Sequence, residues 1–80
     1  MSRQHHYLKT ETEYFQAVER GEKKFELRIN DRDFRKYDII YFQEVVMGVP
    51  TGRELLGLAI QYILEGPEFG LLDGWCILNW

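Results

Sequence analysis

The chain has little of what marks a disulfide-stapled, secreted or membrane-spanning protein. Its single cysteine, Cys76, cannot form an internal disulfide, which favours a reducing compartment. No apolar run approaches the length of about 20 residues that a membrane-spanning helix needs. The N-terminus also lacks the apolar core of a signal peptide. We therefore expect a complete cytoplasmic chain with no membrane partner.

Signals for metals and cofactors are equally scarce. His5 and His6 are adjacent, so on a strand they point to opposite faces and suit a shared metal ion poorly. The chain has no phosphate-binding loop and no dinucleotide fingerprint, and Pro67 interrupts the glycines of "GPEFG". We expect no metal and no cofactor.

The chain has enough apolar residues to form one hydrophobic core. Of its 80 residues, 45% are hydrophobic and 15% aromatic, enough for a small domain without metal or disulfide staples. No linker, repeat or low-complexity tract divides the chain. Residues 1–80 are therefore predicted to form a single domain.

Charge is distributed unevenly along the chain. The net charge is -3, yet seven of the ten Lys and Arg residues lie in residues 20–36, which sum to +3. Residues 1–19 sum to -1 and residues 37–80 to -5. A basic segment flanked by acidic ones suggests a localised site for an anion.

The first third of the chain predicts a strand followed by a helix. "HHYLK" (5–9) resembles a short strand, and "TETEYFQAVERG" (10–21) resembles a helix with an apolar face. Thr10 and Glu13 have the spacing of a capping box, with Thr12 as a rival cap. Gly21 suits the left-handed position that closes a helix.

The rest of the chain predicts strands and turns. In "KKFELRIN" hydrophobic residues recur with a period of two, which is typical of a strand. For residues 53–64 a bent strand is preferred to a helix, with Gly57 at the bend. The remaining predicted segments are a turn at 30–34, a strand at 37–45, a hairpin connection at 47–52, a loop at 65–74 and a strand over "WCILNW".

The predicted order is therefore β-α-β-β-β-β, an α+β chain with one N-terminal helix. Four consecutive strands with short connections favour a small barrel of about five strands. Closing the barrel would also remove the sheet edges that these apolar strands would otherwise expose.

One motif stands out: Gly21-x-Lys23-x-x-Glu26-x-Arg28. The stretch "GEKKFELR", followed by "NDRDF" and "YDII", resembles the ASCH domain family (activating signal cointegrator homology) of the PUA-like superfamily. With "TGRE" and "YILEGPEFGLLDGW" downstream, the resemblance covers nearly the whole chain and points to a small bacterial and phage branch. It implies a PUA-like β-barrel that binds RNA or a modified nucleotide in a cleft lined by the motif residues.

Strand alternation puts Glu26, Arg28 and Asn30 on one face of the strand. We expect the other face, "F-L-I" at 25, 27 and 29, to pack inward. Arg28 offers planar donors to a phosphate or carbonyl, and Glu26 accepts from a base amine or ribose hydroxyl. The candidate ligand-binding residues are Lys9, Lys23, Glu26, Arg28, Asn30, Arg32 and Tyr62, with Tyr41 and Phe34 also available for stacking.

Several alternatives remain open from the sequence. The Glu26–Arg28 pair could be only a solvated strand face, and Phe34 could be a core plug in a charged turn. A related ASCH branch resembles amidohydrolases of acetylated cytidine, with Lys23 as the candidate base. That branch has a threonine where this chain has Glu26, and its later glutamate has no clear counterpart here. A third function is protein binding through "GPEFGLLDGW" and Trp80.

Overall fold

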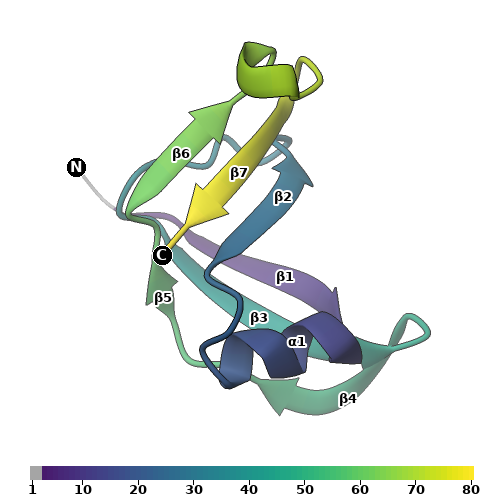
Figure 1. Cartoon of the computed structure of the whole chain (residues 1–80). Helices are drawn as coiled ribbons and strands as arrows, with labels where there is room; N and C mark the ends of the chain where they lie inside the picture. The colour runs from purple at the N-terminus through teal and green to yellow at the C-terminus, as the bar shows by residue number, and fades with distance from the viewer. Residues whose placement is uncertain (1–2) are drawn as a thin grey trace.

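A computed structural model describes residues 3–80 and shows an α+β chain built mostly of strands (Figure 1). Its elements are β1 (His5–Glu11), α1 (Thr12–Glu19), β2 (Phe25–Ile29), β3 (Ile39–Val46), β4 (Val49–Glu54), β5 (Leu58–Ala59), β6 (Tyr62–Glu65), a 3-10 turn (Glu68–Gly70) and β7 (Trp75–Asn79). Within this part of the chain, no helix has the length and apolar character needed to cross a membrane.

The strands form two sheets. In the first sheet, β1 runs parallel to β3, which also pairs antiparallel with β4 and β5. In the second sheet, β7 lies between β2 and β6, and both pairings are antiparallel. Over residues 3–80 no strand pairing joins the sheets into a closed barrel, and seven strands replace the predicted five. The sheets lie at an angle, with α1 against the first (Figure 1).

One hydrophobic core fills the space between the two sheets and the helix. Leu8 and Phe42 come from the first sheet, Phe15 from α1 and Leu78 from the second, and all four are fully buried. The core is completed by Val18, Phe34, Ile40, Ile60 and Cys76. Burial raises the pKa of the Cys76 thiol, as do the nearby carboxylates Glu65 and Asp31. The thiol therefore serves as a small buried hydrophobe, as predicted.

The structure confirms the predicted C-terminal end of the helix but not its predicted N-terminal cap. Gly21 has a φ of +77°, and the N–H groups of Gly21 and Glu22 donate to the carbonyls of Val18 and Ala17. This pattern is a Schellman motif, which confirms the predicted stop. The predicted capping box is wrong, because the residue that precedes α1 is Glu11 and no side chain caps the first turn.

The two threonines expected to cap the helix have other partners. Thr10 is buried in β1, and the Thr12 hydroxyl donates to the carboxylate of Glu44 at 2.8 Å. Thr51 donates to the other oxygen of Glu44 at 2.7 Å. These hydrogen bonds lower the pKa of Glu44 despite its burial, and the nearby Arg53 adds to the effect. Glu44 therefore ties α1 to β3 and β4.

The predicted long strand over residues 53–64 is split among β4, β5 and β6, so that the chain passes from the first sheet to the second. Pro50 lies inside β4, where an edge position tolerates it. Gly57 marks the break, as expected. A Cβ there would lie 2.4 Å from Cγ2 of Ile39, so only glycine lets the chain pass.

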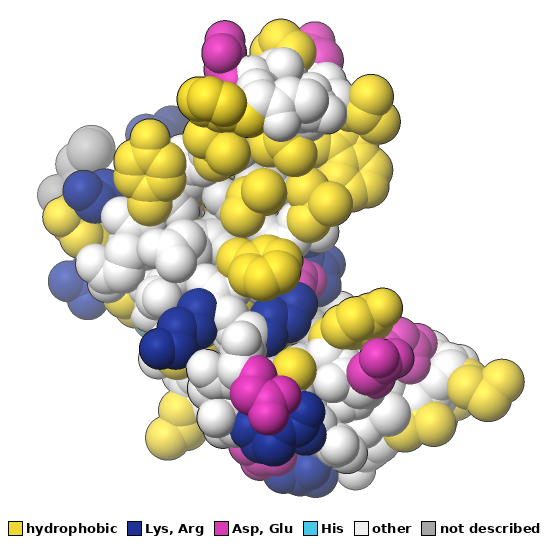
Figure 2. Space-filling model, viewed as in Figure 1, with side chains coloured by type: hydrophobic (Ala, Val, Ile, Leu, Met, Phe, Trp, Pro, Cys, Tyr) yellow, Lys and Arg dark blue, Asp and Glu magenta, His cyan; other side chains and the backbone are white. Residues whose placement is uncertain are grey.

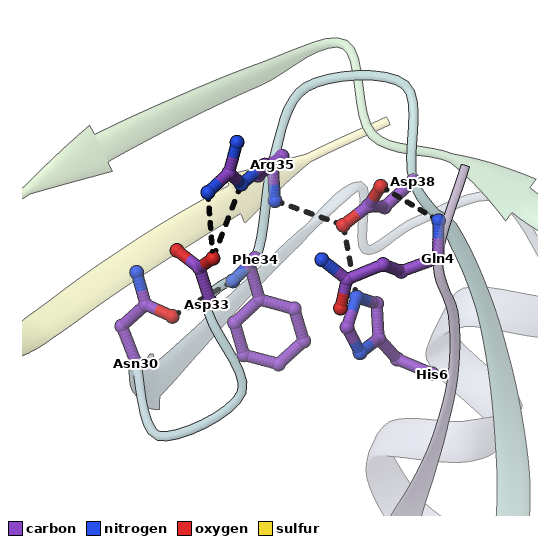
Figure 3. A network of polar contacts seen from close by, with 7 residues as sticks. All are labelled: Gln4, His6, Asn30, Asp33, Phe34, Arg35 and Asp38. Carbon is purple, nitrogen blue, oxygen red and sulfur yellow. Dashed lines mark hydrogen bonds and ion pairs between the residues drawn. The ribbon is translucent and has the colours of Figure 1, made fainter. Parts of the chain in front are cut away.

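The charged segment between β2 and β3 is fixed to β1 by Asp38 (Figure 3). The Asp38 carboxylate is buried and accepts hydrogen bonds from the backbone N–H groups of Gln4 and Arg35, both at 3.0 Å. His6 Nε2 donates to the same carboxylate at 2.9 Å. His6 is thus a satisfied core histidine.

Phe34 confirms the core-plug alternative for "NDRDF". Its side chain is 3% exposed, and its ring meets the edge of the His6 ring at 4.6 Å between centroids. Its backbone N–H donates to Oδ1 of Asn30 at 2.9 Å, which shapes the turn (Figure 3). The turn therefore has a structural role in addition to its charge.

We predict that Asp38→Asn destabilises the fold in a pH-dependent way. Burial alone would raise the pKa of Asp38, but the hydrogen bonds from His6, Gln4 and Arg35 outweigh it and lower the pKa. The stability that Asp38 contributes is then present above its unfolded pKa of about 3.9 and is lost as pH falls through the folded pKa. At pH 7 the variant should lose about 1–3 kcal/mol of unfolding free energy, measured by urea denaturation.

The gap between wild type and Asp38→Asn should narrow as the pH falls below about 4. The matched control is Asp33→Asn, because Asp33 forms only an exposed ion pair with Arg35. An equal gap at every pH would contradict the role given to the Asp38 carboxylate.

Candidate functional site

Strand β2 presents its polar side to the interior, opposite to the prediction. Glu26 is paired with Leu78 and Arg28 with Cys76 on β7, and both partners are fully buried. The three apolar residues of β2 are about half exposed on the outer face: Phe25, Leu27 and Ile29. The expectation that they pack inward is wrong, because the β7 register turns Glu26 and Arg28 to the core side.

Glu26 lies between two cations. Its Oε1 accepts a hydrogen bond from Lys23 Nζ at 2.5 Å and its Oε2 accepts one from Arg28 Nε at 2.8 Å. The side chains of Lys23, Glu26 and Arg28 are 15%, 12% and 25% exposed, so this network is shielded from solvent. It is therefore more than the solvated strand face left open by the sequence.

Lys23 is also held by its surroundings. Its Nζ donates to the carbonyl of Phe25 at 2.6 Å and lies over the rings of Phe25 and Trp80, 5.2 and 5.8 Å from their centroids. Trp80 in turn packs against Phe42 of the core. The position of the ammonium is therefore fixed by β2 and by the C-terminus.

Two arginines join the sheets where a closed barrel would have backbone hydrogen bonds. Arg28 Nη2 donates to the carbonyl of Lys9, and Arg32 Nη1 donates to the carbonyl of Tyr7, both at 2.7 Å. Both acceptors belong to β1, an edge strand whose alternate carbonyls face away from β3. The side chains satisfy these carbonyls and keep β1 and β2 apart.

Two adjoining clefts border the network on either side, and Figure 2 shows the molecule hollowed between its two lobes. The first has a volume of about 430 Å³ and is lined by Lys9, Thr10, Glu11, Tyr14, Lys23, Phe25, Glu26 and Leu27. The second has a volume of about 390 Å³ and is lined by Glu26, Leu27, Arg28, Ile29, Asp31, Arg32, Phe34 and Trp75. Glu26 and Leu27 line both, so the clefts meet at the network.

The clefts bring together five of the seven predicted site residues: Lys9, Lys23, Glu26, Arg28 and Arg32. They leave out Asn30, which shapes the 30–34 turn, and Tyr62, which is 61% exposed on the outer face of β6. Tyr41 is also elsewhere, stacked on Tyr7 across β1 and β3.

Eight further residues border the clefts without having been predicted as ligand-binding: Thr10, Glu11, Tyr14, Phe25, Leu27, Ile29, Asp31 and Trp75. Tyr14 belongs to α1 but is half exposed. Its two neighbours at the core, Phe15 and Val18, are buried. Because Tyr14 is a tyrosine rather than an aliphatic residue, its amphipathic ring was the one available signal.

The lining has a small excess of positive charge. Four cations (Lys9, Lys23, Arg28 and Arg32) meet three carboxylates (Glu11, Glu26 and Asp31). Among residues 3–80, no group of three or more His, Cys, Asp or Glu side chains could hold a metal ion. The clefts therefore combine charged groups of both signs with apolar and aromatic side chains.

A family model described as a domain of unknown function (DUF3850) matches residues 5–80. This chain belongs to that family. It is also similar to an "Uncharacterized 12.9 kDa protein in GpA 3'region" of Escherichia phage P2, with 38% identity over 50 residues. The aligned part covers 62% of this chain and 46% of the phage protein, so the chain spans about half the length of that relative.

We predict that Glu26→Ala destabilises the fold, because it leaves Lys23 and Arg28 as two partly buried cations without their shared carboxylate. The expected loss is about 1–3 kcal/mol of unfolding free energy by urea denaturation. The control is Glu22→Ala, since Glu22 pairs with Arg20 on the surface and should change stability little. Equal effects of the two substitutions would show that the network does not stabilise the fold.

Proposed function

We propose that the chain is a binding module for a short single-stranded RNA segment or a single modified nucleotide, held in the paired clefts between β1 and β2. The observation that carries this proposal is the Lys23–Glu26–Arg28 network at the junction of the two clefts. The kinship with ASCH-type, PUA-like domains that the resemblance implies is part of the same proposal.

The chemistry of the lining matches the parts of a nucleotide. Arg28 and Lys23 offer charged donors to a phosphate, and Glu26 offers acceptor oxygens to a base amine or a ribose hydroxyl. Tyr14 and Trp75 stand at the two clefts, where aromatic rings can stack on bases. Such stacking contributes roughly 1–3 kcal/mol per base in single-strand binders.

Cleft size and charge favour a small ligand over a duplex. Volumes of about 430 and 390 Å³ fall in the range of roughly 300–1,000 Å³ that is usual for small-ligand sites. A duplex binder gains most of its affinity from many phosphate contacts. This chain has a net charge of -3 and only one excess cation in its clefts, so it suits a localised ligand better.

The position of Lys23 favours binding over hydrolysis. A lysine acting as general base needs a free lone pair aimed at the substrate. Lys23 Nζ instead donates to Glu26 and to the Phe25 carbonyl. The same geometry suits a fixed positive charge that orients a ligand.

We predict that Arg28→Ala weakens binding of a short fluorescently labelled single-stranded RNA at least about tenfold, measured by anisotropy at fixed salt, which corresponds to about 1.4 kcal/mol. Lys23→Ala should act in the same direction. The control is Lys36→Ala, because Lys36 lies over the Tyr37 ring outside the two clefts. Circular dichroism of each variant separates loss of binding from loss of fold.

Unchanged RNA affinity in folded Lys23→Ala and Arg28→Ala would overturn the proposal. Release of acetate from acetylcytidine by the wild type, abolished in Lys23→Ala, would also overturn it and would assign an amidohydrolase instead. A duplex bound more tightly than single-stranded RNA of the same length would contradict the localised cleft.

A further inference from the structure

The outer face of the second sheet is uncharged and apolar. By strand register, its side chains are Phe25, Leu27, Ile29, Tyr62, Leu64, Trp75, Ile77 and Asn79. Phe25, Leu27 and Ile29 are each about half exposed, and Tyr62 is 61% exposed. In Figure 2, hydrophobic side chains crowd over this part of the molecule. We call these eight residues the outer face.

The outer face continues onto the loop before β7. Leu72 is 70% exposed and lies with Leu27 and Trp75 around a shallow hollow of about 250 Å³. A contiguous exposed apolar area of this kind is uncommon on monomeric proteins and usually marks an interface. The two strands at its margins, β2 and β6, are the edges of the sheet.

Opposite charges flank the two ends of the outer face. Lys24 precedes Phe25 at one end and is exposed. Glu68 and Asp73 lie in the β6–β7 connection at the other end and are also exposed, whereas Glu65 pairs with buried Cys76 and so is on the inner side of the sheet. Figure 2 shows acidic side chains at the top of the apolar area, beside the 3-10 turn. The ends are separated by the length of β2, five residues or about 17 Å.

We infer that the outer face is an interface between two copies of this chain, related by a two-fold axis with their β2 strands antiparallel. In that arrangement Lys24 of each copy meets the acidic β6–β7 connection of the other, so the same attraction occurs twice. The uncharged centre of one face then covers the uncharged centre of the other. Only this orientation brings opposite charges together at both ends of the outer face and apolar side chains together at its centre.

Other occupants match the face less well. A membrane surface or an RNA strand is anionic, and the carboxylates of Glu68 and Asp73 in the β6–β7 connection would repel it. A second copy presents the opposite charge at that end and an apolar surface of equal length in the middle. The charge pattern therefore selects self-association.

The experiment is analytical ultracentrifugation of the full chain over a range of concentrations. The wild type should reach twice its chain mass of 9.6 kDa. Tyr62→Asp should raise the dimer dissociation constant at least about tenfold, since it places a charge on the apolar outer face. The control is Leu56→Asp, because Leu56 is 88% exposed and lies off the outer face.

Charge reversal tests the orientation. Lys24→Glu and Glu68→Lys should each weaken the dimer, and the double variant should recover part of the loss because the opposite charges meet again. A wild type that stays monomeric up to about 1 mM would overturn the inference. A dimer insensitive to Tyr62→Asp would overturn it too, and so would a double variant no better than the worse single one. None of the four substituted residues lines the two clefts, whereas Phe25, Leu27, Ile29 and Trp75 of the outer face do. The RNA affinity of the same variants is therefore measured at a concentration at which they are monomeric, which tests the proposed function separately.

Discussion

The structure depends on one carboxylate placed between two cations. Glu26 accepts from Lys23 and from Arg28, and Arg28 continues to the Lys9 carbonyl on the facing edge of β1. Without Glu26, Lys23 and Arg28 would be two like charges without a shared partner on the side of β2 that faces the core. With it, the polar side of β2 can lie inward and the strand can still pack against buried Leu78 and Cys76.

That arrangement has two consequences on opposite sides of the second sheet. On the inner side, side chains rather than backbone hydrogen bonds span from β2 to β1, which leaves the two clefts open. On the outer side, the apolar residues of β2 are turned to solvent and join those of β6 and β7. The proposed ligand site and the proposed interface therefore both follow from the orientation of a single strand.

The local backbone conformation could be predicted where a single residue determines it. Gly21 stops the helix because only a left-handed position allows the two closing hydrogen bonds. The motif side chains Lys23, Glu26 and Arg28 meet in one hydrogen-bonded network. Alternation along β2 was also correct, but a period of two does not say which side faces the core. The β7 register decides that, and β7 lies nearly 50 residues further along the chain.

Long-range partners explain the other differences. Thr10 and Thr12 have the spacing of helix caps, yet Thr12 bonds to Glu44, more than 30 residues away. Residues 53–64 have the pattern of one strand, but the chain uses them to cross from one sheet to the other. Neither feature can be recognised from the neighbouring residues in the sequence. Trp75 and Tyr14 were missed at the clefts for the same reason, because their neighbours there come from distant segments.

The central claim is that the Lys23–Glu26–Arg28 network contacts the ligand. The most direct measurement is a nitrogen-detected NMR titration of the arginine Nε–Hε groups with a short single-stranded RNA. Arg28 Nε–Hε should shift in a saturable way, because its partner Glu26 lies in both clefts, whereas the Arg53 signal should stay fixed, since Arg53 bonds Glu19 away from them. An Arg28 signal that stays fixed while RNA binds elsewhere would contradict the account.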